Sequence, residues 1–126
     1  MTLEKSEERT PTPLSQVVIN MAVESWRFGR VFERVLLKLD AGEQNRFRSQ
    51  FRWFSKKVDE ALSEAGLHIV NVEGQPFDPG TAATPLNIED FGGNDTLIVD
   101  QMIEPIIMGK DGLVRTGTVI LRKVDQ

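Results

Sequence analysis

The residues that could do chemistry are concentrated in one basic and aromatic segment. Between Gln44 and Val58 the sequence carries five cations and no acid, with four large aromatic side chains among them. The cations are Arg46, Arg48, Arg52, Lys56 and Lys57, and the aromatics are Phe47, Phe51, Trp53 and Phe54. Such a segment can bind nucleic acid, because cations attract phosphates and aromatic rings stack on bases.

Two observations favour a structural role for this segment instead. Its phenylalanines fall on the apolar repeat of a helix, and the isoelectric point of the chain, about 5.0, is low for a dedicated polyanion binder. We therefore expect the cations to form a solvated helix face paired with Glu24, Glu33 and Glu60. Nucleic acid is not the favoured partner.

Enzymatic chemistry has little support in the sequence. The chain has no Cys and a single His, which excludes disulfides, thiolate metal sites, a cysteine nucleophile and a multi-histidine metal site. His68 is expected to be a structural residue at the start of a strand. The stretch Gly92-Gly93-Asn94 lacks the Lys and the Ser or Thr of a phosphate-binding loop. The sequence therefore predicts a protein that is not an enzyme and that binds no metal or cofactor.

The charges divide the 126-residue chain, with its net charge of −4, into parts. Residues 13–65 hold nine basic and seven acidic side chains, whereas residues 66–126 hold four basic and nine acidic ones. Residues 1–12 have too few apolar side chains to form a core, and we expect a disordered tail there. No apolar run is long enough for a membrane span or a secretory signal, so a cytoplasmic protein without a membrane partner is expected.

An apolar repeat predicts two helices in residues 13–66. Its first part has spacings that alternate between four and three residues: Leu14, Val18, Met21, Ser25, Phe28, Phe32, Val35 and Leu39. This predicts a helix of about 26 residues, roughly 39 Å long. Asp40 to Glu43 break the repeat, which resumes at Phe47 and ends before Gly66. A short connection makes the two helices an antiparallel hairpin.

The apolar stripes of this hairpin are too wide for two helices to bury. A spacing of 3.5 residues is typical of helix bundles, so we expect two copies to form a dimeric four-helix bundle. The expected dimerisation residues are Leu14, Val18, Met21, Phe28, Phe32, Val35, Leu39, Phe47, Phe51, Phe54 and Val58. The alternative is that the second half of the chain folds back over the stripe. Trp26 and Trp53 lie one step off the repeat, and either a wider core or a partner could accommodate them.

The sequence pattern of residues 67–126 predicts a small β domain. Strands are predicted at His68 to Glu73, at Thr96 to Met108 with a break at Pro105, and at Leu113 to Lys123. A hairpin turn is predicted at Gly109 to Gly112. The predicted fold is therefore α+β: an N-terminal antiparallel helical hairpin, residues 13–66, that forms a dimeric four-helix bundle, followed by a small, mostly antiparallel β domain.

Three stretches carry a family resemblance. Behind the helical hairpin come Ala65-Gly66-Leu67-His68-Ile69-Val70, then Gly74-Gln75-Pro76-Phe77-Asp78-Pro79, and finally the strand from Leu113 to Leu121. In this order they resemble the C-terminal two-thirds of GrpE, the nucleotide exchange factor of DnaK-type chaperones. The most specific piece is Gly-x-Pro-Phe-Asp-Pro. The chain looks like a short GrpE that lacks the long N-terminal helical stalk.

The resemblance implies a homodimer that binds the nucleotide-binding domain of a DnaK-type chaperone and promotes ADP release without covalent chemistry. By position it assigns partner binding to the hairpin turn and the closing strand: Lys110, Asp111, Gly112, Arg115, Val119 and Leu121. Two departures stand out. Gly80-Thr81-Ala82 and Arg115-Thr116-Gly117 replace the family's His-Glu-Ala and Arg-Pro-Ala. The alternative is therefore a dimeric interaction adaptor on the same scaffold without exchange activity.

Overall fold

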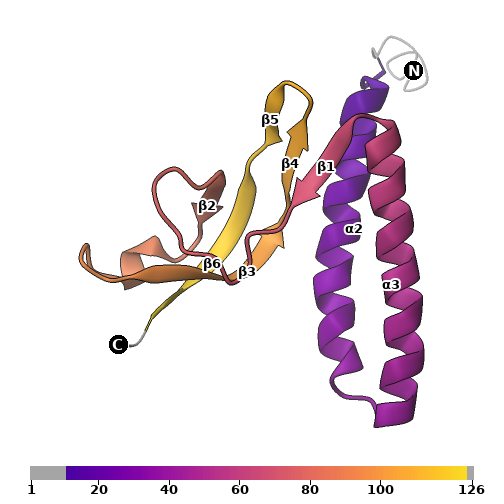
Figure 1. Ribbon diagram of the computed structural model, residues 1–126, viewed down its shortest axis with the longest axis horizontal. Helices are drawn as coiled ribbons and strands as arrows, with labels where there is room; N and C mark the ends of the chain where they lie inside the picture. The colour runs from indigo at the N-terminus through magenta and orange to yellow at the C-terminus, as the bar shows by residue number, and fades with distance from the viewer. Residues whose placement is uncertain (1–10, 125–126) are drawn as a thin grey trace, which may run out of the picture.

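The computed structural model describes residues 11–124, which form a two-helix hairpin beside two small sheets (Figure 1). The predicted α+β class is confirmed. The tail predicted at residues 1–12 falls outside the described residues except for Pro11 and Thr12, which are exposed and belong to no helix or strand.

Two antiparallel helices make up the hairpin: α2, Leu14–Leu36, and α3, Ala41–Glu64. Helix α2 ends three residues before Leu39, the predicted end, because the backbone tightens and Leu39 N–H donates to Leu36 C=O at 3.1 Å. Asp40 then caps α3, and its Oδ1 accepts a hydrogen bond from Glu43 N–H at 2.9 Å. The chain leaves α3 at Gly66, whose φ of +75° favours glycine, as the sequence predicts.

Six short strands form two three-stranded sheets. The first sheet has the order β1-β4-β5 and is antiparallel throughout: β1 is Leu67–Val70, β4 is Ile106–Gly109 and β5 is Gly112–Arg115. The second has the order β2-β6-β3: β2 is Ala83–Pro85, β6 is Gly117–Lys123 and β3 is Leu97–Glu104. Only β2 pairs in parallel, with β6. The prediction of a mostly antiparallel β region is confirmed.

The two sheets are joined where the stretch formed by β3 and β4 crosses the stretch formed by β5 and β6. Pro105 separates β3 from β4, as predicted, and Thr116 separates β5 from β6, so the predicted strand from Leu113 to Lys123 is in fact two strands. At the crossing, a Cβ on Gly117 would lie 2.7 Å from Ile106 Cγ1 and 3.0 Å from Glu104 O. A glycine is therefore required for the strands to approach this closely.

Two groups of buried side chains hold the fold together. The sheet core consists of Val72, Ala83, Val99, Met102, Ile106, Val119 and Leu121. The junction core consists of Ile19, Ala22 and Val23 of α2, Leu62 of α3 and Ile107 of β4. Because Ile107 is fully buried between the sheet and the helices, the hairpin and the β region share one core.

The junction core shows which part of the hairpin the sheets cover. The sheet covers the flank that contains Ala22 and Val23, and the main stripe stays uncovered at Met21 and Phe28. The second half of the chain therefore covers part of the hairpin, including Val18 and Val58, and leaves Met21 and Phe28 exposed.

Candidate functional site

The first candidate surface is an apolar face on the hairpin, here called the apolar helical face. Its members are Leu14, Val17, Met21, Phe28, Val31 and Val35 of α2 and Phe54 of α3. Leu14 is 81% exposed, Met21 67% and Phe28 62%. Met21 lies about 160° around the helix from Val23 of the junction core, so this part of the face is turned away from the sheets. Val31 also lines the cleft beside β3, and Phe54 lines the pocket beside β1. Exposed large apolar side chains gathered along one helix make this face a candidate interaction surface.

The remaining predicted dimerisation residues are half-buried within the chain: Val18, Phe32, Leu39, Phe47, Phe51 and Val58. The rings of Phe32 and Phe51 lie 5.6 Å apart and join α2 to α3. A Cβ on Gly29 would lie 2.9 Å from Phe51 Cζ, so glycine makes room for that ring. The predicted dimerisation residues thus divide into an exposed group on the outside of the hairpin and a half-buried group that holds its two helices together.

The second candidate surface is the tip of the β4–β5 hairpin. Lys110 and Asp111 are exposed at the turn, and Gly112 has the positive φ of +119° that the turn needs. Leu113 and Val114 follow on β5, which is an edge strand, and both are largely exposed. The turn and β5 therefore present charged and apolar groups together.

Two of the six predicted partner-binding residues are not on the surface. Val119 is 0% exposed and Leu121 3%, and both belong to the sheet core. The prediction is wrong for them, because alternate residues of β6 face the core and the break at Thr116 separates that face from β5. Val114, which the prediction left out, is exposed instead.

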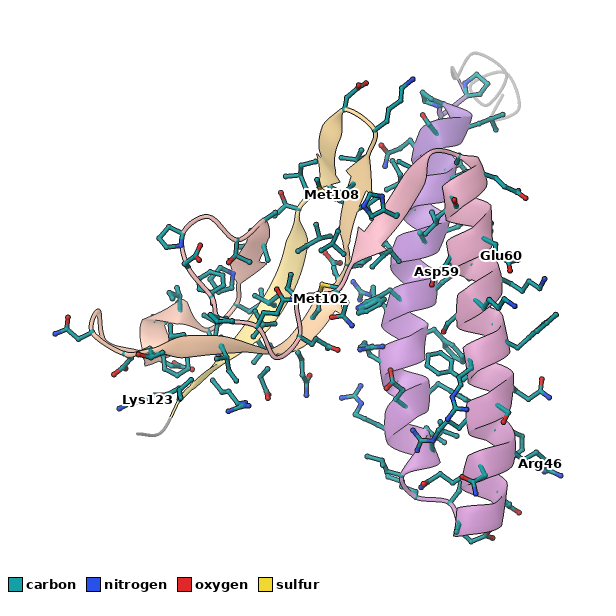
Figure 2. The ribbon with its side chains drawn as sticks, in the orientation of Figure 1. Arg46, Asp59, Glu60, Met102, Met108 and Lys123 are labelled. Atoms are coloured by element: carbon teal, nitrogen blue, oxygen red, sulfur yellow. The ribbon has the colours of Figure 1, made fainter. Side chains whose placement is uncertain are left out.

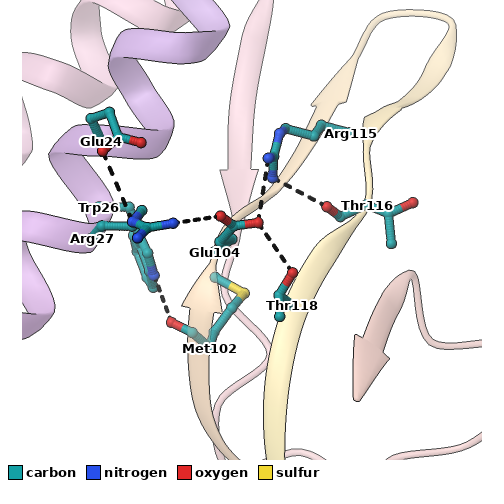
Figure 3. A network of polar contacts seen from close by, with 8 residues as sticks. All are labelled: Glu24, Trp26, Arg27, Met102, Glu104, Arg115, Thr116 and Thr118. Carbon is teal, nitrogen blue, oxygen red and sulfur yellow. Dashed lines mark hydrogen bonds and ion pairs between the residues drawn. The ribbon is translucent and has the colours of Figure 1, made fainter. Parts of the chain in front are cut away.

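Arg115 is accessible but already engaged, in a network centred on Glu104 (Figure 3). Arg115 Nη2 lies 3.3 Å from Glu104 Oε1, to which the Thr118 hydroxyl also donates at 3.2 Å. Arg27 of α2 donates to Glu104 Oε2 at 2.8 Å. Partial burial alone would raise the pKa of Glu104, but hydrogen bonds from Arg27 and Thr118 and the charge of Arg115 lower it overall. The sequence gives only one weak signal for this residue, an acid in an apolar run just before Pro105.

A second set of polar contacts fastens α2 to β3. Trp26 Nε1 donates to Met102 C=O at 2.7 Å (Figure 3), and the Arg30 guanidinium lies 4.1 Å from the centre of the Trp26 ring. Arg30 donates to Glu73 at 3.0 Å, and Glu73 accepts from Met102 N–H at 2.8 Å. Trp26 is therefore structural, which settles the question that its position in the sequence leaves open.

The third candidate surface is the basic face of α3, defined as Arg46, Arg48, Arg52, Lys56 and Lys57 together with Trp53. The expected pairing holds only for Lys57, whose Nζ lies 3.3 Å from Glu60. The other two expected partners bind within α2: Glu24 lies near Arg27, and Glu33 pairs with Arg30. In Figure 2 the side chain of Arg46 points away from the sheets.

Two hollows lie between the helices and the β region. A pocket of about 80 Å³ between the helices and β1 is lined by Trp26, Phe51 and Asp59, and it is far smaller than ordinary ligand sites. A wider cleft of about 400 Å³ between α2 and β3 is lined by Arg30 and Glu73, which already neutralise each other. Within residues 11–124 no three metal-binding side chains cluster, and no described helix could cross a membrane.

Comparison with known proteins adds no family. No family model matches the chain, and no curated protein or solved structure is significantly similar to it. The fold therefore defines the class: an α+β protein in which a helical hairpin with an exposed apolar face shares a core with a small, mostly antiparallel pair of sheets.

Proposed function

We propose that the chain is a homodimeric co-chaperone of the GrpE type, which binds the nucleotide-binding domain of a DnaK-type chaperone and promotes ADP release. The observation that carries the proposal is the apolar helical face, turned away from the sheets. The resemblance of the residue 65–121 segment to GrpE supplies the identity of the partner. A cytoplasmic location is part of the same proposal.

The dimer is the first part of the proposal. Leaving Leu14, Met21 and Phe28 in water is unfavourable, because burying a large apolar side chain fully is worth about 1.5–3 kcal/mol. Two copies of the face would bury each other as a four-helix bundle, in the packing that a 3.5-residue spacing favours. Both β regions would then project outward, since the face and the sheets lie on different sides of α2.

The exchange step needs no reacting group on this chain. A partner that binds the open, nucleotide-free state of the chaperone better than the closed state shifts the equilibrium toward opening. A thousandfold faster release corresponds to about 4 kcal/mol at the transition state for opening. The groups offered for this contact are Lys110, Asp111, Leu113, Val114 and Arg115.

Release of fluorescent ADP from a DnaK-type chaperone tests the proposal. Release should accelerate and saturate with the wild-type chain, and Leu113→Asp should weaken the effect at least tenfold, because it places a charge on the exposed strand. Thr84→Asp is a matched control at the exposed position of β2 and should behave like the wild type. Unchanged ADP release at saturating wild-type protein would exclude the exchange function.

One observation favours the second candidate, a dimeric adaptor without exchange activity. Val119 and Leu121 are buried and Arg115 is paired with Glu104, so the surface expected from the resemblance is smaller than predicted. An adaptor would form the same stable dimer and bind a partner without altering ADP release. Sedimentation and the release assay together therefore separate the two functions.

A further inference from the structure

The basic face of α3 is used neither by the proposed dimer nor by the β4–β5 hairpin. From its charge and its exposed ring we infer that this face binds single-stranded nucleic acid. The ligand chemistry is a chain of phosphodiesters with accessible bases, and the inference does not depend on the proposed exchange function.

The first reason is that four of the five cations of this face form no ion pair, Lys57 being the exception. On the sheets several cations are paired, as are Arg115 with Glu104, Arg122 with Asp100 and Lys123 with Asp95. Among residues 11–124 no carboxylate lies within ion-pair distance of Arg46, Arg48, Arg52 or Lys56. Four positive charges therefore extend along about 15 Å of helix.

The second reason is the arrangement of these charges. Arg48, Arg52 and Lys56 are spaced by four residues, so they follow one side of α3 at intervals of about 6 Å. Guanidinium groups bind phosphate in a bidentate manner, and a row of cations can follow a phosphate backbone. Among the described elements, helix α3 packs mainly against α2 and β1.

The third reason is Trp53, which is 58% exposed among the cations. It lies two residues after Phe51, which packs against α2, and is therefore turned about 160° away from that contact. Lys57 Nζ lies 4.5 Å from the centre of its ring. A flat ring beside phosphate-binding cations is the arrangement with which proteins stack the bases of single strands. An acidic polypeptide would match the charges but would give the indole no base to stack on.

The net charge of −4 sets the expected affinity. A local basic face on an acidic protein should bind weakly, in the range of non-specific complexes with dissociation constants of about 1–100 μM, and the binding should weaken steeply with salt. Single strands give a log–log salt slope of about −0.7 per phosphate contact, so three or four contacts predict a slope between about −2 and −3.

Fluorescence anisotropy of a labelled oligothymidylate of about 20 nucleotides, titrated with the full chain, tests the inference. Arg52→Gln should weaken binding about three- to tenfold and reduce the salt slope by about 0.7. Arg122→Gln on β6 is the matched control: it changes the net charge equally, lies on another element and should leave the affinity within about twofold of the wild type.

Tryptophan emission separates nucleic acid from an acidic polypeptide. Binding of the oligonucleotide should quench Trp53, and Trp53→Leu should abolish the quenching while Trp26 still emits. Absence of binding at low salt, or equal losses for Arg52→Gln and Arg122→Gln, would overturn the inference. Polyglutamate that binds as tightly as the oligonucleotide would also overturn it and would assign the face to an acidic protein. None of these outcomes bears on ADP release or on dimerisation.

Discussion

Arg27 of α2 and Glu104 of β3 lie 77 residues apart in the sequence and form an ion pair at 2.8 Å. The same carboxylate holds Arg115 of β5 through its other oxygen. One side chain thus connects the helix that carries the apolar helical face with the strand that carries the candidate partner contact (Figure 3). The position of β5 relative to the hairpin is therefore fixed by a charged group as well as by the junction core.

Replacing Glu104 should loosen this connection. We expect Glu104→Gln to lower the free energy of unfolding by about 1–3 kcal/mol, because it removes charge-assisted hydrogen bonds from a mostly shielded site. Urea denaturation measures the change. Asp100→Asn is the control: it breaks the exposed pair with Arg122, so its effect should stay below about 1 kcal/mol. Equal effects of the two substitutions would show that Glu104 stabilises the protein no more than an exposed ion pair does.

The stability of the protein should depend on pH through the ionisation of Glu104. The pKa of Glu104 is lower in the folded chain than its ordinary value of 4.5, so the folded state favours the ionised form. This stability is fully present above the ordinary pKa and is lost as the pH falls through the folded pKa. The free energy of unfolding should therefore decline below about pH 4.5, and the decline should be shallower in Glu104→Gln. Identical slopes below that pH would contradict the assignment.

Charge on the apolar helical face should abolish self-association. Phe28→Asp should convert the proposed dimer to a monomer in sedimentation at micromolar concentration and leave the helical content unchanged, because Phe28 is mostly exposed within one chain. Leu37→Asp is a matched control, since Leu37 is 72% exposed but lies beyond the end of α2 and off the face. A wild-type chain that sediments as a monomer would remove the basis of the bundle.

Gly117 offers a test of the strand crossing. A methyl group there would meet Glu104 O and the Ile106 side chain and backbone, so Gly117→Ala should destabilise the protein by about 1–3 kcal/mol. Gly93→Ala should have little effect, because open space surrounds that Cβ position and its φ is not positive. Thermal unfolding of both variants measures the difference. Equal stability would mean that the strands move apart readily at the crossing.

Sequence patterns predicted the parts of this fold that depend on local rules. The four–three repeat located both helices, Gly66 located the exit from α3, and Pro105 located the break between β3 and β4. Each of these signals arises from residues close together in the chain, so tertiary structure did not have to be known.

The remainder depends on contacts between distant segments. Strand β2 has three residues and includes Pro85, so it has no alternation to detect, and only its parallel pairing with β6 defines it. The Glu104 network and the burial of Val119 follow from how the two sheets cross. The wrong assignment of Val119 and Leu121 came from extending one strand face through the break at Thr116.

The burial of Ile107 also determines how the chain can fold. Its neighbours in the junction core come from residues 19–23 and from Leu62, so the cluster closes only after β4 has been added to the hairpin. The hairpin contacts are local and form quickly, whereas this contact spans more than eighty residues and forms late. A fragment that ends before β4 would keep Ile19, Val23 and Leu62 in water. The helices therefore reach their native stability only once β4 has joined them, during synthesis as well as in refolding.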